Sequence, residues 1–69
     1  MNLAFLKSTD GIGPGAYLTK HGYWQPYVSY RHGNVSTIVK FGLAGAPSQR
    51  EALRASCRKA RELRRLKKS

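Results

Sequence analysis

The chain has 69 residues, of which 13 are Lys or Arg and three are Asp or Glu, so its formal net charge is +10. A chain of this length builds one domain with a small core, near the lower size limit for folding without cross-links. Cys57 is the only cysteine, so no internal disulfide can form, and a lone thiol is typical of a reducing compartment. The excess of positive charge indicates an anionic partner, and nucleic acid is the first class to consider.

The composition also argues against several other classes. The apolar segment 3–6 is too short for a signal-peptide core or a membrane span, so we expect a cytoplasmic, nucleoid-associated protein of a bacterial or phage-infected cell. The three acids are scattered and form no carboxylate pair, and no nucleophile stands beside a base, so we expect no enzyme. His21 and His32 have no Cys or acid near them in the sequence, so we expect no metal or other cofactor.

Residues 1–14 read as a lead-in, either a flexible arm or a strand-like flap over the core. Its second half is dense in turn formers, which predicts a turn cluster at 11–15. No lysine follows these glycines at the position that a phosphate-binding loop requires, so a nucleotide cradle is not indicated.

Three short strands are predicted next, the first over 16–19 and a turn over 20–22. Residues 22–31 alternate with period two, as one half-buried strand should. Trp24, Val28 and Tyr30 share the face that we expect to be buried, with Trp24 as a core anchor. The opposite face carries Gln25, Tyr27, Ser29 and Arg31.

Residues 35–41 alternate again and predict the third strand. One face holds Val35, Thr37, Val39 and Phe41, and the other holds Ser36, Ile38 and Lys40. Residues 32–34 separate the two runs, and because Gly33 and Asn34 tolerate positive φ, we expect a hairpin there.

A helix is predicted from Gln49 to about Lys67, after a small-residue connector over 42–47. Ser48 is a suitable N-cap, and Glu51 three residues later completes a capping box. The expected apolar stripe consists of Ala52, Leu53, Ala55, Cys57, Ala60, Leu63 and Leu66, with Cys57 as a buried, inert thiol. Arginines line the opposite face at Arg50, Arg54, Arg58, Arg61 and Arg65.

The predicted fold is therefore α+β, a three-stranded antiparallel sheet packed against one C-terminal helix (βββα). We expect the helix to cover the face that carries Trp24, Val28, Val39 and Phe41. The predicted domain spans 15–66, and residues 67–69 form a basic tail.

Several motifs resemble the AP2-like DNA-binding domain of plant transcription factors and of phage or mobile-element proteins. They are Gly15-x-Tyr17, Gly22-x-Trp24-x-x-x-Val28, residues 39–42, and Ser48-x-x-Glu51-Ala52-x-x-Ala55 at the helix start. The arm-binding domains of tyrosine recombinases (integrase type) have the same sheet-plus-helix arrangement. The resemblance covers about residues 15–62, and its motif positions are mostly small or hydrophobic.

In that family the sheet lies in the major groove, which implies DNA contacts from the outward residues of the strands. On this chain they are Tyr17, Thr19, Gln25, Tyr27, Ser29, Arg31, Ile38 and Lys40. Plant members have arginine at several of these positions, whereas this chain has Tyr or Ser. Base readout would then depend on Gln25 with adenine and on Arg31 with guanine. Apart from the resemblance, we also expect DNA contact from Lys20, and secondary phosphate contacts from Arg50, Arg54, Arg58 and Arg61 because of their positive charge.

Two functional hypotheses follow. In the first, the protein is a monomeric DNA-binding accessory or regulatory factor of a phage or other mobile element, active in transcription regulation or recombination. In the second, it is a small inhibitor or adaptor that binds an acidic host protein, because a tyrosine-rich face also suits a protein interface. Double-stranded RNA and a membrane surface are less well supported, since the usual RNA-binding fold begins with a helix and the apolar stripe here is rich in alanine.

Overall fold

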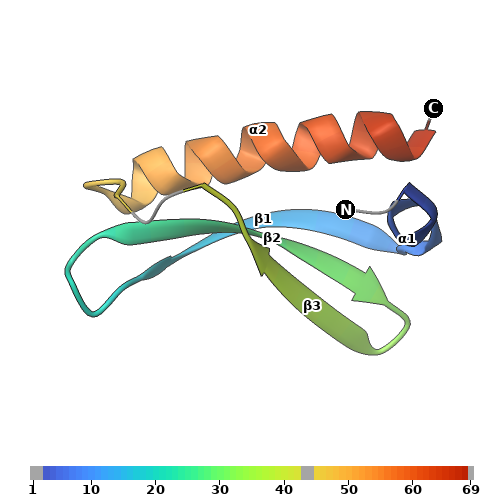
Figure 1. Ribbon diagram of the computed structural model, residues 1–69, viewed down its shortest axis with the longest axis horizontal. Helices are drawn as coiled ribbons and strands as arrows, with labels where there is room; N and C mark the ends of the chain where they lie inside the picture. The colour runs from blue at the N-terminus through green and yellow to red at the C-terminus, as the bar shows by residue number, and fades with distance from the viewer. Residues whose placement is uncertain (1–2, 43–44, 69) are drawn as a thin grey trace.

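The computed structural model describes residues 3–42 and 45–68 of the protein (Figure 1). In chain order its elements are α1 (Leu3–Ser8), β1 (Gly11–Leu18), β2 (Trp24–His32), β3 (Val35–Lys40) and α2 (Gln49–Lys68). The strands form one antiparallel sheet in the order β1-β2-β3, and α2 lies along one side of it. The predicted βββα fold of the α+β class is confirmed. Leu43 and Ala44 of the expected connector and Ser69 of the expected tail lie outside the described residues.

The strand register defines two faces of the sheet. β1 pairs with β2 from Gly11 opposite Arg31 to Leu18 opposite Trp24, and β2 pairs with β3 from Tyr27 opposite Lys40 to His32 opposite Val35. Residues that lie directly opposite one another in an antiparallel pair share a face. The inner face, towards α2, therefore carries the even-numbered residues of β1 and β2 and the odd-numbered residues of β3. The outer face carries Gly11, Gly13, Gly15, Tyr17, Gln25, Tyr27, Ser29, Arg31, Ser36, Ile38 and Lys40.

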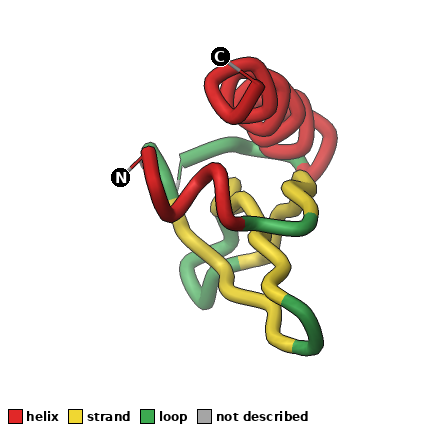
Figure 2. Tube along the Cα trace, turned by 90° about the vertical axis from the view of Figure 1, so that its right-hand side faces the viewer, coloured by secondary structure: helices red, strands yellow, loops and turns green. Residues whose placement is uncertain are grey.

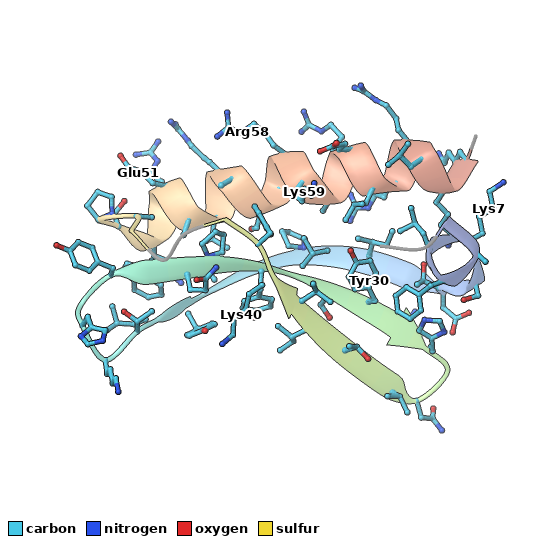
Figure 3. All side chains as sticks on the ribbon, in the orientation of Figure 1. Lys7, Tyr30, Lys40, Glu51, Arg58 and Lys59 are labelled. Carbon is cyan, nitrogen blue, oxygen red and sulfur yellow. The ribbon has the colours of Figure 1, made fainter. Side chains whose placement is uncertain are left out.

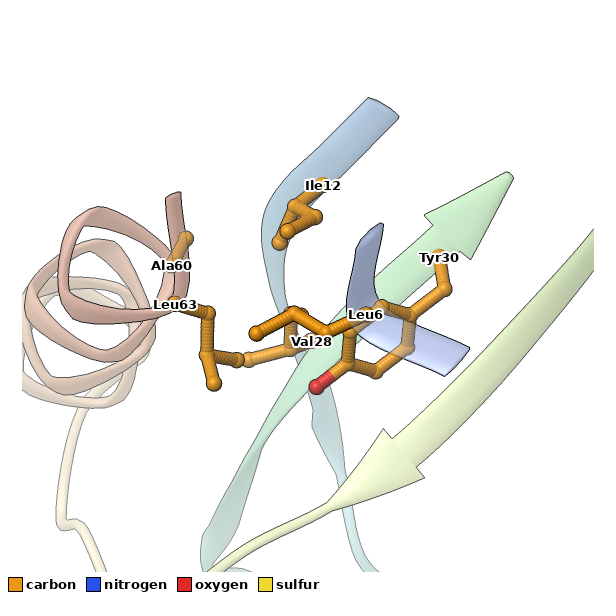
Figure 4. Close-up of a cluster of buried hydrophobic side chains, with 6 residues drawn as sticks. All are labelled: Leu6, Ile12, Val28, Tyr30, Ala60 and Leu63. Carbon is orange, nitrogen blue, oxygen red and sulfur yellow. The ribbon is translucent and has the colours of Figure 1, made fainter. Parts of the chain in front are cut away.

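The core lies between the inner face and α2 (Figure 4). It is formed by the buried side chains of Leu6, Ile12, Val28, Tyr30, Ala60 and Leu63, with Phe41 packed against them. Figure 2 shows α2 as a separate layer above the strands. Because Ala52, Ser56 and Ala60 are small and fully buried, the helix can approach the sheet closely.

The helix α2 begins at the predicted N-cap, where the Glu51 N–H donates to Ser48 Oγ at 3.3 Å. Its buried residues are Ala52, Ser56, Ala60 and Leu63, a stripe narrower than the predicted one. The predicted buried thiol is wrong, since Cys57 is exposed, and Leu66 is also exposed. Both residues lie on the flanks of the helix, outside the arc that faces the sheet.

Residues 3–14 of the predicted lead-in belong to the fold. Residues 3–8 form α1, and β1 already begins at Gly11, where a turn cluster was predicted. The side chain of Leu6 is buried in the core, and the Phe5 ring contacts the Tyr30 ring at 5.6 Å between centroids. The core therefore includes residues on both sides of the boundary predicted at residue 15.

The two edges of the sheet, β1 and β3, differ in their contacts with α2. Arg64 donates from Nε to the Ile12 carbonyl oxygen at 3.1 Å, and Lys67 Nζ donates to the Thr9 carbonyl oxygen, so α2 caps the free edge of β1. Lys67 and Lys68 are helical, in contrast to the predicted tail. At the other edge β3 diverges from α2 (Figure 1), and Val35 and Val39 are exposed. The expected packing of the helix across Val39 is therefore wrong.

Candidate nucleic-acid interface

The outer face of the sheet is the candidate site, because both helices lie on the opposite side. α2 packs against β1 and β2, and α1 packs against α2. In Figure 3 Lys40 lies below the sheet, whereas Arg58 and Lys59 belong to the helix layer above it. The register brings seven of the predicted contact residues together on this face: Tyr17, Gln25, Tyr27, Ser29, Arg31, Ile38 and Lys40.

Three of these residues form what we name the tyrosine–lysine cluster: Tyr17, Tyr27 and Lys40. The two rings lie 6.1 Å apart between centroids at an interplanar angle of 34°, and Lys40 Nζ lies 5.6 Å from the centroid of the Tyr17 ring. That distance is within the range of a cation–π contact, which orients the ammonium group without neutralising it. Gly15 is the residue of β1 that pairs with Tyr27, and the Tyr27 ring lies against it. A Cβ at residue 15 would overlap this ring. The missing side chain at residue 15 thus allows Tyr27 to lie flat on the sheet.

A shallow, side-chain-poor area lies beside this cluster. Gly11 is paired with Arg31 and Gly13 with Ser29, and Ser36 of β3 follows on the far side of Arg31. A Cβ added at Gly11 or Gly13 would meet no atom within 4 Å. Glycine inside a strand often marks a place where a ligand or another backbone approaches closely. The three glycines of β1 alternate with period two, as strand residues do, although glycines in a turn-rich segment also predict a turn.

The two cations of the outer face stand at some distance from each other. Lys40 is paired with Tyr27, and Arg31 lies four residues further along β2. At a rise of about 3.3 Å per residue, the two positions are about 13 Å apart along the strand. Arg31, Lys40 and Ile38 are all exposed, so the groups are open to a ligand.

Gln25 does not fit the base-reading role expected of it. Its side chain is only 6 % exposed, and its Nε2 donates to the carbonyl oxygens of Pro26 at 2.7 Å and Phe41 at 3.0 Å. Both amide hydrogens are therefore used within the protein, and the group stabilises the point where the chain leaves β3. Reading adenine would require the amide to break these bonds, so Gln25 is left out of the candidate site.

Thr19 and Lys20 lie beyond the end of β1, in the turn to β2. The Thr19 hydroxyl accepts a hydrogen bond from the Tyr23 N–H at 3.3 Å. The backbone N–H of Thr19 donates to the Tyr23 carbonyl oxygen at 2.7 Å. Thr19 therefore closes the turn, whereas Lys20 is exposed. Lys20 can reach a ligand only at the end of the outer face.

The arginines expected to make secondary phosphate contacts lie elsewhere. Arg50, Arg54, Arg58 and Arg61 are all exposed, on the side of α2 that faces away from the sheet. The structure therefore does not bring them together with the residues of the outer face.

Other chemistry in the described part of the chain is sparse. No group of three or more His, Cys, Asp or Glu residues there is arranged to hold a metal ion, and no helix there is long and apolar enough to cross a membrane. Burial raises the pKa of the Tyr30 phenol, which belongs to the core. His32 Nε2 is buried without a hydrogen-bond partner beneath Phe5, on the inner face.

We compared the chain with protein-family models, curated proteins and solved structures. No match was found in any of the three comparisons.

Proposed function

We propose that the protein is a small DNA-binding module in which the outer face of the sheet lies in the major groove. The observation that carries the proposal is the combination of an uncovered sheet face with exposed cations and glycines that leave its backbone accessible. Most contacts of DNA-binding proteins go to phosphates, so Arg31 and Lys40 would fix the position of the sheet on the duplex.

The spacing of these two cations supports this docking geometry. Their separation of about 13 Å along β2 is close to the width of the major groove, about 12 Å. A sheet that enters the groove could thus place one cation near each of the two DNA strands whose phosphates border the groove. Ser29 and Ile38 lie opposite each other between them, and their side chains would face the base edges.

The resemblance to AP2-like domains agrees with this proposal and extends it. In that resemblance the module would serve a phage or other mobile element as an accessory or regulatory factor in transcription or recombination. With Gln25 excluded and Arg31 placed on a phosphate, little direct base readout remains, so we expect modest sequence selectivity. Affinity would come mainly from phosphate contacts.

A protein partner is the second candidate, and one observation favours it. Ile38 is 56 % exposed on the outer face beside the tyrosines, and exposed aromatic and aliphatic side chains are typical of protein interfaces. An inhibitor or adaptor that docks on an acidic protein would use the same face.

The test is a binding titration of the parent protein and a charge-removal variant with mixed-sequence duplex at several salt concentrations. We expect binding in the micromolar range or tighter at low salt, with affinity falling linearly in log[salt]. The double substitution Arg31→Gln with Lys40→Gln should reduce that slope by about 2. No binding at low salt, or the same slope in the variant, would contradict the proposal. The second candidate would be favoured if the protein bound an acidic protein with an affinity that changed little with salt, and if Tyr27→Ala reduced that affinity more than the charge-removal variant did.

A further inference from the structure

A second basic surface lies on α2, which we name the arginine row: Arg50, Arg54, Arg58, Arg61 and Arg65. These residues recur every three or four positions, so they share one face of the helix, and all are exposed. At 1.5 Å per residue the row is about 22 Å long from its first to its last member. Nine of the 13 basic residues of the chain lie in α2.

The arginine row faces away from the outer face of the sheet. The buried residues of α2 contact the inner face, so the opposite side of the helix points out of the molecule. Figure 3 shows Arg58 above the helix and Lys40 below the sheet. A straight duplex on the outer face is separated from the row by the thickness of the sheet and the helix. One such duplex cannot contact both surfaces.

Within the described residues, no acidic side chain forms a salt bridge with an arginine of the row. Among residues 3–42 and 45–68, the salt bridge that the structure contains joins Lys59 to Glu62 at 3.6 Å, on the flank of the helix. The pairs Arg50 with Arg54, Arg54 with Arg58, and Arg61 with Arg65 are like charges at i,i+4, which repel one another. A bound polyanion would relieve this repulsion.

The shape and composition of the row favour a double-stranded backbone as its ligand. The row is straight, as is a duplex, whose strands each carry one phosphate per about 3.4 Å of helix axis. It has no aromatic side chain on which single-stranded bases could stack. The apolar residues beside it are Leu53, which is partly buried, and Cys57, which is exposed but small, so the row also lacks the large anchor of a protein hot spot.

We infer that the arginine row binds the phosphate backbone of a second DNA duplex, so that one protein molecule bridges two duplexes. The inference rests on the proposed function, because the first duplex occupies the outer face. Bridging needs no dimer, since the two surfaces lie on opposite sides of the same chain.

The test uses two duplex populations, one carrying a donor and the other an acceptor fluorophore, mixed with increasing protein. Bridging by a molecule with two sites should raise energy transfer at low protein and lower it again in excess protein, because each duplex then binds its own protein molecules. Two variants with equal charge loss are compared. The row variant is Arg54→Gln, Arg58→Gln and Arg61→Gln, and the sheet variant is Lys20→Gln, Arg31→Gln and Lys40→Gln. Binding to a single duplex is measured in parallel by fluorescence anisotropy.

We expect the row variant to keep binding one duplex and to lose bridging by about tenfold or more, because three phosphate contacts are removed. Full bridging by the row variant, or energy transfer that keeps rising in excess protein, would overturn the inference. A parent protein that binds one duplex through the outer face but shows no energy transfer would also overturn it, while leaving the proposed function intact. If the row variant loses all duplex binding and the sheet variant loses none, both the proposed function and the bridging inference are wrong.

Discussion

The ring of Tyr27 lies against Gly15 of the neighbouring strand, in the space that a Cβ at residue 15 would fill. This contact holds Tyr27 flat beside Tyr17 and so fixes the tyrosine–lysine cluster. Gly15→Ala should displace the ring, which is the free end of a side chain. We therefore expect the free energy of unfolding to change by less than about 1 kcal/mol. Duplex affinity should fall several-fold, and unchanged affinity would show that the position of Tyr27 is irrelevant to binding.

Gly13→Val provides the complementary test on the same strand. Nothing lies within 4 Å of a Cβ at residue 13, and valine is a good strand former, so the variant should be at least as stable as the parent. A branched side chain there would nevertheless keep a duplex away from the backbone of β1. Thermal unfolding combined with duplex titration separates the two effects. A variant that is stable and binds as tightly as the parent would show that the outer face does not need its glycines.

The packing of α2 on the sheet depends on small residues. Ala60 is 1 % exposed, so Ala60→Leu should force the helix from the sheet and lower the free energy of unfolding by about 1–3 kcal/mol. Ala55 lies on the flank of the same helix and is only partly buried, so Ala55→Leu is the matched control, with a smaller expected effect. Urea unfolding of both variants measures the difference. Equal losses would mean that the buried arc of α2 is placed incorrectly.

Alkaline pH should destabilise the protein through Tyr30. Burial raises the pKa of its phenol, so the folded state favours the neutral form. The contribution to stability is then fully present below the ordinary tyrosine pKa of about 10 and is lost as pH rises through the raised value, because the unfolded state releases the proton first. We expect Tyr30→Phe to show a shallower decline in urea-unfolding free energy above pH ~10. The two proteins differ only in this hydroxyl, so the comparison isolates Tyr30, and identical declines would contradict the assignment.

Local patterns predicted much of the fold. The alternation in 22–31 and 35–41 gave the strands and their faces, and Ser48 gave the start of α2, because each pattern reflects contacts made within a few residues. The hairpin between β2 and β3 was also predicted. Its turn uses positive φ at Gly33 (+58°) and not at Asn34, and the Gly33 N–H donates to the carboxylate of Asp10, which lies 23 residues earlier in the chain. That contact could not be predicted from a local window.

The errors arise where tertiary packing decides the outcome. Gly11, Gly13 and Pro14 are turn formers by composition, yet pairing with β2 makes them a strand. The alternation places Gln25 on the outward face, but its side-chain amide is buried and donates a hydrogen bond to the carbonyl oxygen of Phe41, 16 residues away. The helix stripe was predicted too broadly because periodicity alone does not say how wide an arc the sheet covers, and β3 turned out to lie outside it.

The most direct test of the central claim is a backbone-amide NMR titration of the labelled protein with a short duplex at two salt concentrations. The proposal predicts saturable shifts in the strand segments that carry the outer-face residues, 11–17, 27–31 and 36–40, and weaker shifts at the higher salt concentration. Shifts confined to the arginine row, without saturation, would contradict it.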